Sequence, residues 1–112
     1  MRFDSTGPLR DIEHHIDLAS QFVAGLGYED FRDDTRTLYA VVRCLEIISE
    51  ASRRLPDEVK ARYPSVPWKD VAGAGNVYRH DYEDIIVKLV WDTVQVALPP
   101  LRAVVASELA RL

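Results

Sequence analysis

The chain has 112 residues, of which 47% are hydrophobic and 29% charged, and its net charge is −4. These values predict one soluble domain over residues 1–112 with a single modest core, and the negative charge argues against bulk binding of DNA or RNA. The single cysteine excludes an internal disulfide, and no apolar run reaches the roughly 20 residues that span a bilayer, so we expect a cytoplasmic protein.

The first half of the chain predicts two helices. Apolar residues recur every three or four positions from Leu9 to Leu26, with Pro8 suited to the first turn. A second helix follows Asp33 and Asp34, which can supply its cap, and it ends before Pro56. Its predicted core stripe consists of Leu38, Val41, Val42, Leu45, Ile48, Ser49, Ser52 and Leu55.

The opposite side of the second predicted helix is charged. Arg43, Glu50 and Arg54 fall within a narrow arc, and Glu50 and Arg54 have the spacing of an ion pair along a helix. We interpret this side as a solvated face, with the wall of an interface or cleft as the alternative. Residues 53–62 form the one basic run that could contact RNA, although we favour its interpretation as a solvated helix end and the connector that follows.

A third helix is expected over residues 67–79, because Pro67 suits a helix start. Residues 57–62 have room for one or two turns before it, and the prolines among residues 63–67 make a rigid connector. Gly73 and Gly75 inside the third helix each cost roughly 1 kcal/mol relative to alanine. We interpret them as a packing surface for another helix, a second copy of the chain or a ligand.

The last apolar pattern runs from Ile85 to Leu109 with helical spacing, interrupted by Pro99 and Pro100, which must kink or restart the helix. No segment alternates with the two-residue period of a strand. We therefore predict an all-α fold, an antiparallel bundle of four to five helices.

The densest polar cluster occupies residues 75–82, which read GNVYRHDY. Asn76 and His80 are four residues apart and share a helix face, with Arg79 beside His80 at the helix end. A histidine can transfer protons near neutral pH and an arginine can hold a phosphate, so the group suits binding or cleavage of a phosphodiester. A histidine and arginine at a helix end can also simply complement the helix dipole.

The same stretch resembles the signature of the HEPN superfamily, an arginine, four to six residues and a histidine, in its HepT-like form that continues as His-x-Tyr. His80, Asp81 and Tyr82 fit that ending. The neighbouring blocks are similar to the same family over nearly the whole chain. They are residues 43–51 for its second helix, 66–73 for the approach to its motif, and 90–94 and 98–101 for its last helix.

The resemblance implies a HEPN-like helical domain that acts as the toxin of a toxin–antitoxin pair, a metal-independent endoribonuclease without a cofactor. It implies a homodimer in which two motif helices form one composite site. His80 would be the general acid or base that helps a ribose 2′-hydroxyl attack the adjacent phosphate. Asn76 would be the polar residue that follows the motif arginine. The partner would be an MntA-like minimal nucleotidyltransferase antitoxin that attaches AMP to Tyr82.

The sequence departs from this signature where the arginine is expected, because Gly75 occupies that position. Arg79 could substitute from the neighbouring turn, although it leaves the helix on a different side. Losing a preorganised charge donor typically costs about 10²–10³ in rate. The alternative function is therefore a catalytically degenerate helical dimer that binds the nucleotidyltransferase or a nucleotide without cleaving RNA.

A third interpretation starts from the His80-Asp81 pair, which resembles the dyad of metal phosphohydrolases of the HD type. His14, His15 and Asp17 are the further ligands that the chain offers. Adjacent histidines on a regular helix point about 100° apart, so they do not converge on one metal ion without distortion.

Overall fold

The computed structural model describes residues 4–78 and 84–112, with side chains described outside 76–78. Every regular element in these ranges is a helix, which confirms the all-α prediction. The elements are α1 (Thr6–Val23), α2 (Tyr28–Arg32), α3 (Thr35–Arg53), α4 (Asp57–Arg62), α5 (Trp68–Tyr78), α6 (Asp84–Asp92), η1 (Thr93–Ala97) and α7 (Leu98–Arg111).

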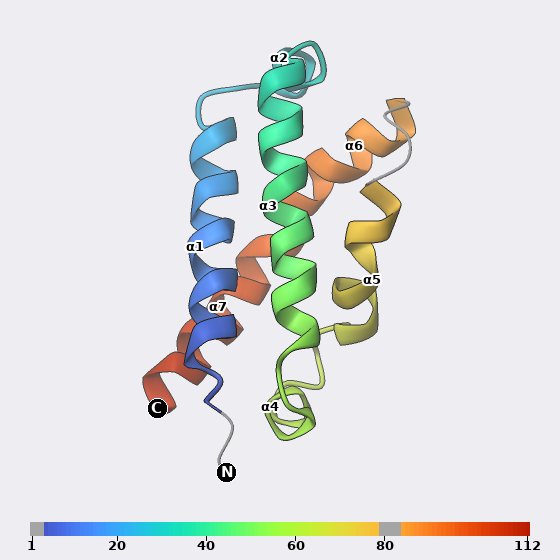
Figure 1. Cartoon of the computed structure of the whole chain (residues 1–112). Helices are drawn as coiled ribbons and strands as arrows, with labels where there is room; N and C mark the ends of the chain where they lie inside the picture. Colours follow the sequence, from blue (N-terminus) through green and yellow to red (C-terminus); the bar gives the residue numbers. More distant parts are fainter. Residues whose placement is uncertain (1–3, 79–83) are drawn as a thin grey trace.

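The long helices form the predicted bundle. Figure 1 shows α1 and α3 side by side and antiparallel, with α5 on the other side of α3 and the α6–α7 helix crossing the bundle diagonally. The short helices α2 and α4 lie at opposite ends of α3 (Figure 1). None of the helices in the described ranges is long and apolar enough to cross a membrane.

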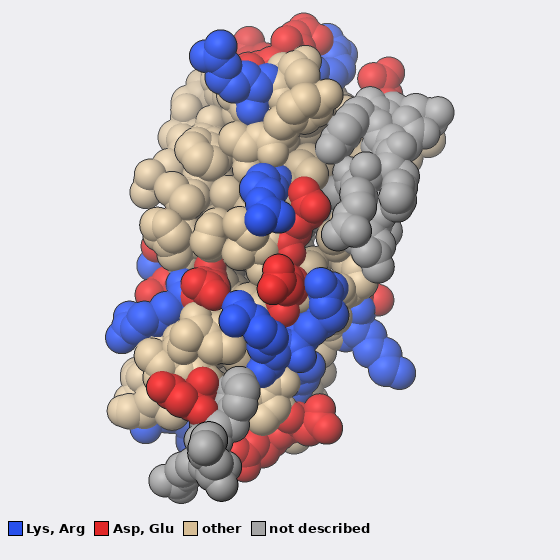
Figure 2. Space-filling view, in the orientation of Figure 1, with Lys and Arg blue, Asp and Glu red and all other residues tan. Residues whose placement is uncertain are grey.

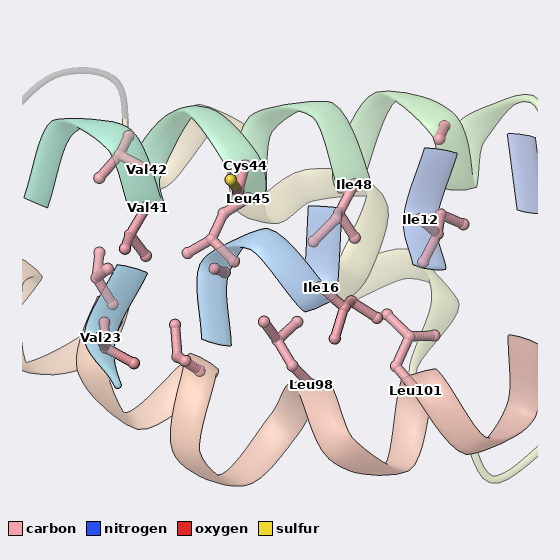
Figure 3. Close-up of a cluster of buried hydrophobic side chains, with 14 of the residues drawn as sticks. Ile12, Ile16, Val23, Val41, Val42, Cys44, Leu45, Ile48, Leu98 and Leu101 are labelled. Carbon is pink, nitrogen blue, oxygen red and sulfur yellow. The ribbon is translucent and has the colours of Figure 1, made fainter. Parts of the chain in front are cut away.

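The core lies between α1, α3 and α7. In Figure 3, Leu45 and Ile48 of α3 point toward Leu98 and Leu101 of α7, with Ile16 of α1 beside them. Every residue of the predicted α3 stripe is buried, which confirms the helical period that predicted it. Cys44 is buried beside this stripe, and burial raises the pKa of its thiol, so it is an unreactive packing residue.

Caps and turns were predicted less completely. The Asp34 carboxylate accepts hydrogen bonds from the Thr37 backbone N–H (3.1 Å) and hydroxyl (2.6 Å), as the predicted α3 cap. Helix α2 was not predicted, because five residues are too few to show a period. Its Phe31 is fully buried, and its ring lies 5.3 Å from that of Trp91 in α6, measured between centroids.

Helix α6 continues into α7 through one turn of π-helix, Thr93–Ala97, in which the Leu98 N–H donates to the Thr93 carbonyl five residues earlier. Pro99 and Pro100 follow directly after this wide turn, and the backbone at Ala97 and Leu98 is still helical. We expected the prolines to kink or restart the helix. Instead, the wide turn accommodates the missing proline N–H groups, and the helix continues through them.

Candidate active site

Helix α5, which leads into the predicted motif, begins and ends within one residue of its predicted bounds. Its start is held by Trp68, whose ring Nε1–H donates to the backbone carbonyls of Lys60 and Tyr63, both at 3.1 Å. These acceptors belong to the end of α4, so one indole fixes the connector between the two helices. Helix α5 then packs chiefly along α3.

The middle of α5 is tied to α3 by one serine hydroxyl. Ser49 Oγ donates to the Val71 carbonyl at 2.7 Å and accepts from the Gly75 backbone N–H at 3.0 Å. Ser49 is 2% exposed. The sequence placed Ser49 in the core stripe but gave no sign of its partner, because serine on an apolar face is also typical of simple small-residue packing.

The two glycines of α5 face different surroundings. Gly75 is buried, and a Cβ atom built on it would lie 3.4 Å from Ser49 Cβ and 3.5 Å from Glu46 Cα. Gly73 is exposed, and a Cβ atom there would meet nothing within 4 Å. Residues that are two positions apart on a helix point about 200° apart, so the two glycines cannot share one face. Gly75 is the predicted packing residue, and its partner is α3 of the same chain.

Three of the four predicted site residues, Arg79, His80 and Tyr82, lie outside the described residues. The backbone of Asn76 belongs to the last turns of α5, and its side chain is not among those described. The described structure therefore defines the platform that carries the motif, which is the α5 backbone and its attachment to α3 and α4.

The charged face of α3 is a solvated surface with its own partners. Figure 2 shows acidic and basic side chains intermixed on the face that α3 presents, without a continuous basic track. Arg54 pairs with Asp11 of α1 at 2.9 Å instead of with Glu50. Arg53 donates to the Ala72 carbonyl of α5, and Arg62 binds Glu108. The arginines of the candidate RNA-binding run are thus engaged within the molecule.

A small apolar pocket of about 60 Å³ lies beneath α5, where it faces η1 and α7. Its lining includes Val71 and Ala74 of α5, Ser49 of α3 and Ala97 of the π-helical turn. The pocket has almost no polar surface, so it suits neither a nucleotide nor an ion.

The described residues proposed for an HD-type metal site have other contacts. His15 Nδ1 lies 2.7 Å from the Asp11 carbonyl, and Asp17 is bound at 2.6 Å by Arg102 of α7, which holds the pKa of that carboxyl below its usual range. Within residues 4–78 and 84–112, no three histidine, cysteine or acidic side chains are grouped to hold a metal ion.

Comparison with known proteins identifies the family of this chain. A family model described as ribonuclease HepT-like matches residues 12–108, which include α5 and the whole motif. The chain belongs to the HepT-like ribonuclease family. HepT-like relatives include a probable ribonuclease HepT from Thermococcus cleftensis, 37% identical over 84% of this chain and 86% of the relative.

Two further relatives, both named as putative RNases, are similar over most of this chain. A putative RNase of Methanocaldococcus jannaschii is 34% identical over 84% of this chain and 78% of its own length. Another, from Caldanaerobacter subterraneus subsp. tengcongensis, is 34% identical over 83% of each chain. No solved structure matches the chain at a significant level. The HepT-like assignment confirms the resemblance read from the motif and its neighbouring blocks.

Proposed function

We propose that this protein is a metal-independent endoribonuclease, the toxin of a HepT-like toxin–antitoxin pair. The observation that carries the proposal is the family match, which spans the stretch with His80 and Tyr82. The curated relatives are named as ribonucleases, and their similarity extends over most of the chain.

In the proposed reaction, the neutral imidazole of His80 takes the proton of a ribose 2′-hydroxyl. The 2′ oxygen attacks the adjacent phosphorus, and the bond from phosphorus to the 5′ oxygen of the next nucleotide breaks. The products are a 2′,3′-cyclic phosphate and a free 5′-hydroxyl, which needs one proton. A histidine suits both proton transfers because it titrates near neutral pH. Arg79 and Asn76 would donate to the phosphate oxygens on which charge develops.

Tyr82 is the proposed site of neutralisation by an MntA-like nucleotidyltransferase. Its phenolic oxygen would attack the α-phosphorus of ATP, forming a phosphodiester to AMP and releasing pyrophosphate. The attached AMP brings a negative charge and a nucleoside within two residues of His80, so it would repel and block the RNA backbone. The proposal predicts an AMP-sized mass increment on wild-type protein incubated with the partner and ATP, and none on Tyr82→Phe.

A homodimer is the proposed assembly, with the motif helices of two copies forming one site. Support comes from α6, the first helix after the motif, where Ile85 is 78% exposed and Leu89, one turn later, 42% exposed. Large apolar side chains that share one exposed helix face commonly mark an interface. In a dimer, a second copy of His80 would be available to protonate the leaving 5′ oxygen.

The decisive experiment compares the wild-type protein with His80→Ala in an RNA-cleavage assay and in a bacterial growth assay. We expect wild type to cleave RNA and slow growth, and His80→Ala to lose at least about 10²-fold in rate because its proton-transfer group is gone. His14→Ala is the matched control, since His14 is exposed on α1. Equal activity of His80→Ala and wild type would refute the catalytic role.

A degenerate, non-cleaving dimer is the second candidate function, and the packing of Gly75 against α3 favours it. Gly75 has no cationic side chain and its backbone N–H is bound to Ser49, so this position contributes no charge to a transition state. This candidate predicts wild-type protein that is dimeric and modified on Tyr82 but leaves RNA intact. RNA cleavage by wild type that is lost in His80→Ala would exclude it.

A further inference from the structure

The Ser49 hydroxyl forms an unusual link between two helices, because both of its partners are backbone groups of α5. It donates to the Val71 carbonyl at 2.7 Å and accepts from the Gly75 N–H at 3.0 Å. Those two groups face each other across one turn of α5. Two hydrogen bonds from one side chain of α3 thus fix both the axial position and the rotation of α5 relative to α3. Ser49 is 2% exposed.

The other buried serine of α3 shows what an ordinary core serine does. Ser52 is fully buried, and its hydroxyl donates to the Ser49 carbonyl of its own helix at 2.6 Å. Ser49 and Ser52 therefore have the same side chain, the same helix and nearly the same burial. They differ in whether the hydroxyl acts across the helix interface or within α3.

The two hydrogen bonds of Ser49 to α5 require a small residue at position 75. A methyl group at 75 would make ordinary contacts of 3.4–3.5 Å with Ser49 and with the Glu46 backbone. A longer side chain would have to continue from a Cβ atom that already contacts Ser49 and the Glu46 backbone. Ser49 and residue 75 therefore share the limited space of this buried part of the α3–α5 interface.

We propose that Ser49 is a positioning residue for the motif, because its hydroxyl holds α5 in place through the backbone of Val71 and Gly75. An arginine at position 75 is accommodated only when residue 49 is replaced by glycine. The inference rests on the proposed function, because it assigns Ser49 the task of presenting the segment that carries His80 and Tyr82. The α5 backbone runs directly into that segment, so a shift of the helix would be passed on to it.

The first test compares Ser49→Ala with Ser52→Ala. Each variant loses one buried hydroxyl, so we expect similar melting temperatures. Amide hydrogen exchange in α5 should be roughly fivefold to tenfold faster in Ser49→Ala and unchanged in Ser52→Ala. In RNA cleavage, Ser49→Ala should lower kcat roughly tenfold to a hundredfold with little change in KM, because misplacement affects the reacting groups more than binding. Ser52→Ala should keep the wild-type kcat.

The second test is a double-mutant cycle at positions 49 and 75, again followed by hydrogen exchange in α5. Gly75→Ala should leave α5 protection at or above the wild-type level, and Gly75→Arg should reduce it. Ser49→Gly combined with Gly75→Arg should restore protection by more than about threefold over the value expected from independent effects. Ser52→Gly combined with Gly75→Arg is the matched control and should show no such recovery.

Equal α5 exchange in Ser49→Ala and Ser52→Ala would overturn the proposal, as would additive effects in the cycle. A loss of kcat that is the same for the two serine variants would also overturn it. The exchange measurements do not depend on ribonuclease activity. If wild type proves inactive on RNA, the proposed function fails, while α5 exchange still decides whether Ser49 holds the helix.

Discussion

Glu108 of α7 is the acidic residue most completely withdrawn from water among the described residues, with an exposed fraction of 1%. Its carboxylate accepts hydrogen bonds from Arg62 of α4 and from the Tyr63 hydroxyl, the latter at 3.1 Å. Arg111 lies 3.5 Å away on the next turn. A buried charge with this many partners is stabilising only as long as they remain in place.

Glu108→Gln should lower the free energy of unfolding by about 2 kcal/mol at neutral pH, because the carboxylate that pairs with the Arg62 guanidinium becomes a neutral amide of similar shape. Denaturant unfolding measures the difference. Glu50→Gln is the control, since Glu50 is exposed and its replacement should change stability by less than about 0.5 kcal/mol. Equal effects of the two substitutions would show that the buried pair contributes nothing.

The same pair should make stability depend on acid. Arg62 beside Glu108 holds the pKa of that carboxyl below its usual range. Because the folded-state pKa is lower than the unfolded-state pKa, the stabilisation is fully present above the unfolded value and is lost as pH falls through the folded one. The gap between wild type and Glu108→Gln in a pH series of unfolding curves should therefore close on acidification. A gap that widens would contradict the assigned ion pair.

At the scale of elements, α5 is attached by Trp68 at its start, and by Ser49 and Arg53 of α3 in its middle. The start depends on an indole N–H that reaches carbonyl groups of α4 and of the connector. Elsewhere along its length, α5 packs mainly against α3. Loosening one attachment should therefore affect α5 more than the core between α1, α3 and α7.

Trp68→Phe should destabilise α5 locally by about 1 kcal/mol, because a smaller aromatic ring remains but the N–H donor is lost. Hydrogen exchange should accelerate in α5 and remain unchanged in α1. Trp91→Phe is the control, since Trp91 packs against Phe31 of α2 and should not change exchange in α5 specifically. If Trp68→Phe accelerates hydrogen exchange equally in all helices, Trp68 does not act as a local attachment of α5.

For the whole molecule, the exposed apolar face of α6 predicts association. If two copies meet there, Ile85→Glu should shift the chain from dimer to monomer in light scattering after size exclusion. Its melting temperature as a monomer should be little changed, because Ile85 is 78% exposed. Leu112→Glu, a matched loss of an apolar side chain that is 63% exposed, should leave the mass unaltered. A wild-type chain that is monomeric would refute the prediction.

Sequence periodicity was sufficient for the bundle because long amphipathic stripes report directly on burial. The α3 stripe from Leu38 to Leu55 was predicted residue by residue, and α5 was placed within one residue. Periodicity could not place α2, which is too short, or the π-helical turn, which depends on how the helix continues through Pro99. The family motif predicts roles for His80 and Tyr82, whereas the proposed role of Ser49 required the position of a second helix.

The apolar pocket beneath α5 has a mechanical consequence. It leaves about 60 Å³ of space between the motif helix and the π-helical turn, lined by side chains that cannot hold water in place. A state that removes such space occupies less volume, so hydrostatic pressure favours it. Compression should therefore change the contact between α5 and the α6–α7 helix before it changes the close-packed core.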